Sequence, residues 1–220
     1  MSEDLPSISK KSPRDHIVNV VKATLAALPV AGAIASLIDD YIPKSTEVSL
    51  NNFIVDLKNR LEALGNRIEV EMINKDEFAE LFISCYQGVV RTRQQDKIKI
   101  FARILANILL KEGDAEKVTY SELDHLVRAM DNISVGALRV LAAIFSYSSK
   151  ISSGNRLNFS DISSIIKDLD PSLIMGLLNE LNSVNLIHMP GAPMVRERDY
   201  ANYPIELTEL GRRFVEKFAS

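Results

Sequence analysis

In the first part of this chain, apolar residues recur every three or four positions, in one segment after another. This spacing places them on one face of an α-helix. None of the segments alternates apolar and polar residues as a strand would, so the pattern predicts an all-α bundle. The predicted helices run over about 15–38, 46–67, 74–89, 95–110 and 120–130.

Residues typical of helix starts and stops lie at the ends of these segments. Asn74 is followed three residues later by Glu77, a capping-box pattern that starts a helix, and Gly113 supplies a stop after the fourth helix. The residues expected to be buried are Leu50, Phe53, Ile54, Leu57, Leu61, Leu64 and Ile68 in the second helix, Phe78, Leu81, Phe82, Cys85 and Val89 in the third, Ile98, Phe101, Ile104, Leu105, Ile108 and Leu109 in the fourth, and Leu123, Leu126, Val127 and Met130 in the fifth.

The segment 23–38 has two interpretations. Its sixteen residues carry no charge, are rich in Ala and Gly, and are interrupted by Pro29. Pro29 should start, kink or break a helix, and a membrane-spanning helix needs about 20 apolar residues. A helix buried at the centre of the bundle is the main interpretation, and a segment that leaves the bundle for a membrane is the alternative.

After Asn132 the pattern changes to short strands between helices. Ser134 caps a predicted helix to about residue 147, and further helices are expected over about 160–167 and 171–185, the second with Pro171 in its first turn, where a missing N–H costs nothing. A short extended piece is expected over 157–159, and strands are expected over 186–189 and 205–207 around a loop at 190–203. Thr208 caps the last helix. The expected core comprises Leu138, Leu141, Phe145, Ile162, Ile165, Leu173, Ile174, Leu177, Leu178, Leu181, Ile187 and Phe214.

This order of elements resembles the winged helix-turn-helix of bacterial regulators. The residues that carry the resemblance are LLNELNSVNLIHM, where a helix runs into a strand, and IELTELGRRF, where a strand runs into a helix. The N-terminal pieces LPVAGAIASLI and FARILANIL are more loosely similar to uncharacterised bacterial helical proteins, some of which are associated with abortive infection and phage defence. The resemblance implies a winged helix with a small β-wing at 133–220. The polar, Pro- and Ser-rich N-terminus indicates a flexible arm at 1–14, and the helical periodicity indicates a bundle at 15–132, so the expected fold is mainly α.

The amino-acid composition limits the class of protein and the compartment in which it is expected. The apolar fraction is 46% and the charged fraction is 25%. Both values are ordinary for a globular protein. The single cysteine excludes an internal disulfide and favours a reducing compartment. The N-terminus lacks the order of charged and apolar residues found in a signal peptide, so a cytoplasmic location is expected.

Catalytic motifs are absent from the sequence. There is no phosphate-binding loop, dinucleotide-binding glycine pattern or nucleophile elbow. His16, His125 and His188 lie in different predicted elements, and with Cys85 they are too few and too scattered for a zinc site. We therefore expect no catalytic residue, no cofactor and no metal site.

DNA binding is the familiar use of a winged helix, but the charges do not favour it. The net charge is −3 overall, and residues 133–220 hold nine basic and nine acidic residues. The helix expected to enter the major groove, 171–185, has no Lys or Arg, although such helices usually contact phosphates and bases with them. Glu180 and Asp170 would face phosphates. The residues that remain as possible contacts are Arg156, Lys167, Asn179, Asn182, Arg196, Arg198 and Arg212.

One basic cluster lies at the junction of the third and fourth predicted helices. It is interrupted only by Asp96. It is either a solvated helix end paired with Glu77, Glu80 or Glu112, or a patch for nucleic acid, an acidic protein or lipid headgroups. Its members are Arg91, Arg93, Lys97, Lys99 and Arg103.

These observations lead to three hypotheses for function. The leading one is a non-catalytic interaction protein, which binds a protein partner or a second copy of itself, in a bacterial stress or phage-defence system. The second is a winged-helix transcription regulator, for which nucleic acid is the partner. The third is a membrane-active effector that uses the 23–38 segment, and a membrane is the least expected partner.

Overall fold

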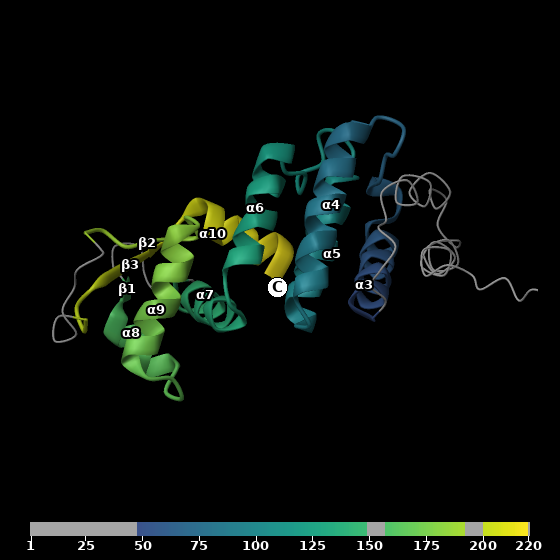
Figure 1. Ribbon diagram of the computed structural model, residues 1–220. Helices are drawn as coiled ribbons and strands as arrows, with labels where there is room; N and C mark the ends of the chain where they lie inside the picture. The colour runs from purple at the N-terminus through teal and green to yellow at the C-terminus, as the bar shows by residue number, and fades with distance from the viewer. Residues whose placement is uncertain (1–47, 149–156, 192–199, 220) are drawn as a thin grey trace, which may run out of the picture. The chain divides into compact units, whose positions relative to one another are not determined.

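The computed structural model describes residues 48–148, 157–191 and 200–219 (Figure 1). This part of the chain is mainly helical, as the sequence predicts. The predicted arm at 1–14 and the predicted helix at 15–38 lie outside the described residues. The elements are α3 (Val48–Leu64), η1 (Gly65–Arg67), α4 (Lys75–Arg91), α5 (Gln95–Ile108), α6 (Tyr120–Asn132), α7 (Val135–Ser148), β1 (Leu157–Asn158), α8 (Phe159–Ile165), α9 (Pro171–Ser183), β2 (Ile187–His188), β3 (Pro204–Leu207), α10 (Glu209–Phe214) and a π-type turn, η3 (Val215–Ala219).

Contacts divide the chain into two compact units, Met1–Tyr120 and Ser121–Ser220. The sequence places the boundary at residue 132, whereas this division falls at the start of α6. Within the second unit, α6 is held by an ion pair from Arg213 to Glu122, with 3.0 Å between Nη2 and Oε2, and by His125, whose ring nitrogen lies 3.3 Å from the carbonyl oxygen of Val184. These long-range contacts join α6 to the helices that follow it, and no local sequence signal predicts them.

In the first unit, α3 and α4 pack against α5. Every residue that the sequence assigns to the buried faces of α3, α4 and α5 is buried, including Cys85, whose thiol pKa is raised by that burial. Gly88 of α4 lies directly against the ring of Phe101 in α5, where a side-chain carbon would collide with the ring. Asn74 accepts hydrogen bonds from the N–H groups of Asp76 and Glu77, so it caps α4 as predicted.

In the second unit, three short antiparallel strands form a sheet in the order β1-β3-β2. Leu157 pairs with Ile205, and Ile187 pairs with Leu207. These residues lie in the segments expected to be extended. Strands β1 and β2 are shorter than expected, whereas β3 begins one residue earlier than expected. Helices α7 and α9 pack against each other, and α7 also contacts α8 and β3.

The turn from β3 into α10 is fixed by Thr208 and Gly211. The Thr208 hydroxyl oxygen accepts a hydrogen bond from Gly211 N at 2.9 Å and lies 2.7 Å from the carbonyl oxygen of Asn185, to which it donates. Gly211 lies so close to the carbonyl oxygen of Leu186 that no side-chain carbon fits there. The sequence LTELG therefore has a physical explanation, because the threonine caps the helix and the glycine admits the neighbouring backbone.

Two residues that the sequence assigns to the core are exposed. Leu173 is 50% exposed and Ile165 is 44% exposed. In α9 the buried stripe starts at Ile174, and Leu173 lies about 100° further round the helix. In α8 the helix ends at Ile165, and its neighbour Ile166 is the residue that is buried. Leu138 and Phe145 are half-buried.

Among the described helices, no single helix is long and apolar enough to cross a membrane. Helices α6 and α7 meet these criteria only when they are taken together, and they are bent by 120° relative to each other. The 23–38 segment lies outside the described residues.

Candidate functional site

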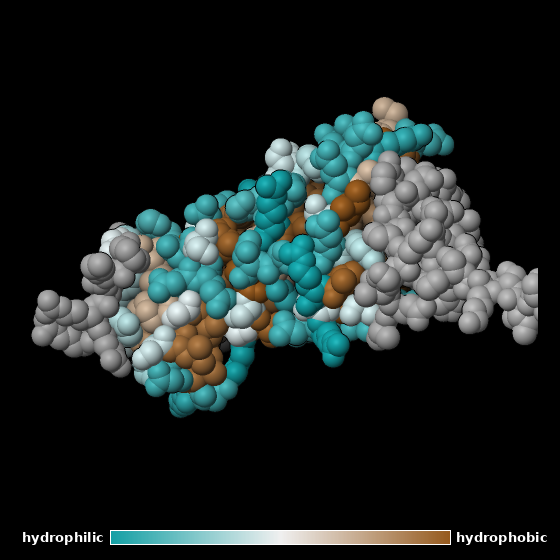
Figure 2. Space-filling model, in the orientation of Figure 1, coloured by the Kyte–Doolittle hydropathy of each residue, from teal (hydrophilic) through white to brown (hydrophobic). Residues whose placement is uncertain are grey.

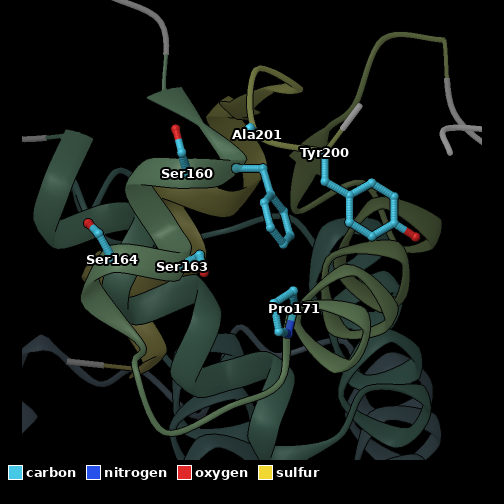
Figure 3. A pocket seen from close by; sticks show the side chains of 7 residues that line it. Ser160, Ser163, Ser164, Pro171, Tyr200 and Ala201 are labelled. Atoms are coloured by element: carbon cyan, nitrogen blue, oxygen red, sulfur yellow. The ribbon is translucent and has the colours of Figure 1, made fainter. Parts of the chain in front are cut away.

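A hollow of about 510 Å³ opens on the second unit where α8, the start of α9 and the loop before β3 meet (Figure 3). We call it the serine–aromatic hollow. Figure 3 shows the serines of α8 on one side, Tyr200 on the other and Pro171 between them. Its lining residues are Phe159, Ser160, Ser163, Ser164, Pro171, Tyr200 and Ala201.

Backbone hydrogen bonds hold the two sides of this hollow together. The N–H of Phe159 donates to the carbonyl oxygen of Tyr203 at 2.9 Å, and the N–H of Ser160 donates to that of Ala201 at 3.1 Å. The rings of Phe159 and Tyr200 are tilted by 53° with centroids 5.3 Å apart. This is a favourable geometry for an aromatic pair. The loop before β3 is therefore fixed to the first turn of α8.

The described residues that line the hollow are uncharged. None of its seven lining residues carries a charge at neutral pH. Ser164 donates its hydroxyl hydrogen to the carbonyl oxygen of Asp161 at 2.7 Å. Within the described residues, the Ser160 and Ser163 hydroxyls donate to no protein acceptor. The arrangement suits an uncharged ligand with apolar surface and hydrogen-bond acceptors.

Two large apolar residues are exposed on α8 and α9, the helices that carry most of the lining of the hollow. Figure 2 shows hydrophobic atoms gathered over the part of the second unit where α8 and α9 lie. The two residues are Leu173 and Ile165, which the sequence wrongly assigns to the core. Neither of them is among the residues that line the hollow.

The outward face of α9 is also uncharged. Its exposed residues are Pro171, Ser172, Leu173, Gly176, Asn179 and Ser183.

Glu180, which the sequence places opposite phosphates, is turned inward instead. Its carboxylate accepts a hydrogen bond from the N–H of Ser134 at 2.7 Å, at the start of α7. That orphan N–H group needs an acceptor, and Glu180 supplies it.

The two aspartates before α9 are engaged as well. Asp170 accepts a hydrogen bond from the N–H of Ser172 at 2.8 Å and so caps α9. Asp168 forms a two-pronged ion pair with Arg139 at 2.6 and 2.7 Å. The guanidinium group lowers the pKa of Asp168 below its usual value. The contribution of this pair to stability is therefore present at neutral pH and is lost as the pH falls through that lowered pKa.

The predicted nucleic-acid contacts of the second unit are dispersed. Asn179 and Lys167 are exposed. Asn182 accepts a hydrogen bond from the N–H of Met189 at 2.9 Å and so holds the residue that follows β2. Arg212 is partly exposed, with 4.0 Å between its Nε and a carboxylate oxygen of Glu209. The remaining predicted contacts, Arg156, Arg196 and Arg198, lie outside the described residues.

The basic cluster of the first unit contains both exposed and buried members. Arg91, Arg93 and Lys99 are exposed, whereas Lys97 is only 7% exposed. Arg103 is half-buried, and this burial, together with the nearby positive charge of Arg60, lowers its pKa. Burial raises the pKa of Asp56, which the charge of Lys99 opposes.

Two of the three acidic residues expected to pair with this cluster, Glu80 and Glu112, bind other residues. Glu80 accepts a hydrogen bond from the Tyr120 hydroxyl at 2.6 Å. Glu112 pairs with Lys117 at 2.7 Å.

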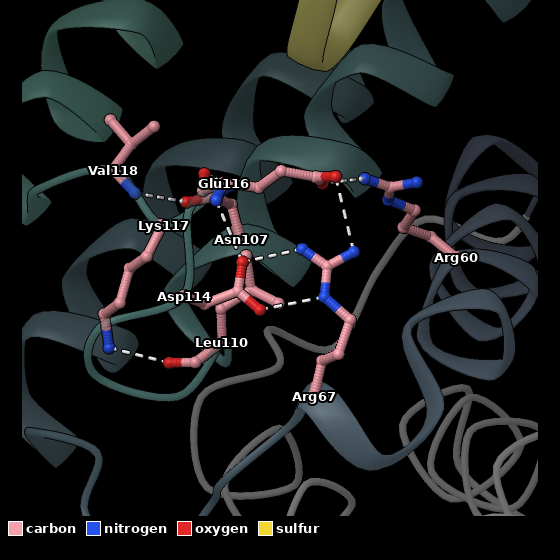
Figure 4. A network of polar contacts seen from close by, with 8 residues as sticks. All are labelled: Arg60, Arg67, Asn107, Leu110, Asp114, Glu116, Lys117 and Val118. Carbon is pink, nitrogen blue, oxygen red and sulfur yellow. Dashed lines mark hydrogen bonds and ion pairs between the residues drawn. The ribbon is translucent and has the colours of Figure 1, made fainter.

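Loop 111–119 is fastened to the end of α3 by a network of charges that we call the 111–119 clasp (Figure 4). Arg67 donates to both carboxylate oxygens of Asp114, at 2.6 and 2.8 Å. Glu116 accepts from Arg67 at 3.3 Å and from Arg60 at 3.4 Å. The carboxylates raise the pKa of Arg67 further above its usual value.

A buried amide completes the clasp. Asn107, which is 4% exposed, donates to the carbonyl oxygen of Glu116 and accepts from the N–H of Val118, both at 2.9 Å. Lys117 donates to the carbonyl oxygen of Leu110 at 2.7 Å. The sequence signals none of these pairings, because they join residues that are distant in the chain or lie in an irregular loop.

A second hollow of about 380 Å³ lies beside this loop in the first unit. Of its acidic lining residues Glu77, Glu112 and Asp114, the last two form ion pairs with Lys117 and Arg67. Among the residues that the structure describes, no group of three or more His, Cys, Asp or Glu could hold a metal ion.

The serine–aromatic hollow was not predicted. Phe159, Pro171 and Tyr200 lie in three different elements, and no motif connects them.

Comparison with protein-family models, curated proteins and solved structures finds no match to this chain.

Proposed function

We propose that the protein is a non-catalytic interaction protein, and that its second unit is a winged helix that docks on another protein. The order α7, β1, α8, α9, β2, β3, α10 is the order of elements in a winged helix. The antiparallel sheet β1-β3-β2 supports the same proposal. In this arrangement α9 takes the place of the recognition helix.

The observation that carries a docking role is the uncharged outward face of α9. A helix that reads DNA offers cationic side chains to phosphates and hydrogen-bonding groups to bases. Here Glu180 is the only charged residue of α9, and it is bonded to Ser134 N. Exposed Leu173 and Ile165 add apolar surface, which is what a protein interface buries at its centre.

A transcription regulator is the second candidate, and one observation favours it. The carboxylates of Glu180, Asp168 and Asp170 are all engaged within the chain, so they are less free to repel phosphates than the sequence predicts. A DNA-binding role would then depend on the exposed amide of Asn179 and on Arg196 and Arg198.

Two further parts of the proposal rest on the sequence. A place in a bacterial stress or phage-defence system is supported by the resemblance of the N-terminal pieces alone. A membrane-active role for the 23–38 segment stays a prediction, because the segment lies outside the described residues.

A duplex-DNA titration separates the two candidates. At physiological salt we expect binding no tighter than about 10⁻⁶ M, the non-specific range. Tight, sequence-dependent binding that Arg196→Ala and Arg198→Ala abolish would replace docking by transcription regulation.

Site-specific photo-crosslinking tests docking directly. A photoreactive amino acid at position 173 should give a discrete protein adduct in cells that express the protein naturally. The same amino acid at Asn59, an exposed position on α3, is the matched control and should not give that adduct. Absence of an adduct specific to position 173 would contradict docking through α9.

A further inference from the structure

We infer that the serine–aromatic hollow binds an extended, proline-containing peptide segment of a partner protein. This inference rests on the proposed docking function and names the chemistry of what docks. Three properties of the described lining residues support it: their lack of charge, their rings and their hydroxyl groups.

The lack of charge excludes the ligands that need a counter-charge. Among the residues that the structure describes, no Lys, Arg, Asp, Glu or His lines the hollow. A phosphate or carboxylate group placed there would give up water without gaining a cation, and this desolvation is unfavourable. The occupant should therefore present an uncharged surface, as a peptide of apolar and prolyl residues does.

The rings suit proline in particular. Phe159 and Tyr200 are held at 53° to each other, and Pro171 contributes a third rigid ring to the lining. Proline-rich segments dock on aromatic-lined grooves because their rings are apolar and their extended backbone is already ordered. An open hollow of about 510 Å³ accommodates one or two residues of such a segment.

The hydroxyl groups supply the polar part of recognition. A polyproline II segment has no internal hydrogen bonds, so its carbonyl groups all seek donors. Ser160 and Ser163 lie on α8 beside the rings, and in the described part of the chain their hydroxyls serve no protein acceptor. They are therefore able to donate to the carbonyl oxygens of a bound segment.

The test is a titration of the full chain with a fluorescein-labelled proline decapeptide, followed by fluorescence anisotropy. A Gly-Ser decapeptide with the same label is the peptide control. We expect saturable binding of the proline peptide, with a Kd between about 10 μM and about 1 mM, and no saturation with the Gly-Ser peptide.

Two variants on different elements locate the binding. Tyr200→Ala removes a ring and should weaken binding about tenfold. Ser163→Ala removes one donor and should weaken it about two- to tenfold. Ser183→Ala, on α9 outside the hollow, is the matched control and should bind like the unmodified protein. Thermal melts of all three variants establish that they are folded.

The outcomes separate this inference from the proposed function. Absence of saturation up to about 1 mM, or equal affinity of the unmodified protein and both Tyr200→Ala and Ser163→Ala, overturns the peptide class. A crosslinked adduct at position 173 would in that case leave docking intact. Tight sequence-specific DNA binding would overturn docking, whatever the peptide titration gives.

Discussion

The 111–119 clasp in the first unit and the serine–aromatic hollow in the second differ most in charge. The clasp gathers two arginines, a lysine and two acids around a loop, and each of these charged groups has a partner within the first unit. The seven described residues that line the hollow carry no charge, and two of them present serine hydroxyls without a protein acceptor in the described part of the chain.

This difference shows why charge alone is a poor guide to function in this protein. Partly exposed ion pairs such as Arg60 with Glu116 contribute little energy each and mainly fix a loop. Contiguous exposed apolar surface marks a place that another molecule can cover, and Leu173 and Ile165 are large apolar residues exposed on the two helices that line the hollow. We therefore interpret the clasp as architecture and the hollow as the site.

The comparison depends first on the difference between two neighbouring residues of α9. Ile174 is fully buried, and Ile174→Ala should lower the free energy of unfolding by about 2–5 kcal/mol. Leu173 is half exposed, so Leu173→Ala should change it by only about 0.5 kcal/mol. Urea denaturation followed by circular dichroism measures both. Equal losses would mean that Leu173 belongs to the core and that the face beside the hollow is covered.

Within the clasp, substitution of the buried amide of Asn107 should cause the largest loss of stability. Asn107→Ala leaves the N–H of Val118 and the carbonyl oxygen of Glu116 without their partners. This change should lower the free energy of unfolding by about 1–3 kcal/mol, measured by urea denaturation. Asn59 is exposed on α3, and Asn59→Ala is the control, with an expected change of only about 0.5 kcal/mol. An Asn107→Ala protein as stable as the control would show that the clasp does not hold the loop.

The smallest effect should come from Gly176 on the outward face of α9. A methyl group added there meets no atom within 4 Å. Gly176→Ala should therefore gain helix propensity and stabilise the protein by about 0.5–1 kcal/mol. In Gly136→Ala, the matched change in α7, the methyl group would lie 3.1 Å from Leu177, and we expect no such gain. Thermal melts compare the two, and a loss of stability in Gly176→Ala would indicate that the outward face is packed against something.

Much of the helical structure was predictable from the sequence. Every residue assigned to the buried faces of α3, α4 and α5 is buried, because each helix is long enough for its period of about 3.6 residues to be unmistakable. Further residues of these helices, such as Tyr86, Lys97 and Ile100, are buried as well and were not predicted. The caps Asn74 and Thr208 were predicted, because a cap depends on the chain next to it. The shorter helices were harder, since two turns do not define a face, and this is why Ile165 was wrongly assigned to the core.

The candidate site was not predictable in the same way. The sequence drew attention to charged residues, and it counted Glu180 and Asp170 against DNA binding. The fold turns Glu180 to the start of α7 and uses Asp170 as a cap, so these charges are engaged before any ligand arrives.

The sequence by itself determined which residues form helices, which residues cap them and which apolar stripes are buried, because these properties depend on neighbours a few positions apart. Only the tertiary structure decided that Phe159 and Tyr200, 41 positions apart in the sequence, form one aromatic pair. It also decided that Arg67 binds Asp114 and that Leu173 is exposed. The physical reason is that these outcomes depend on contacts between distant segments, and the local period of the chain carries no record of them.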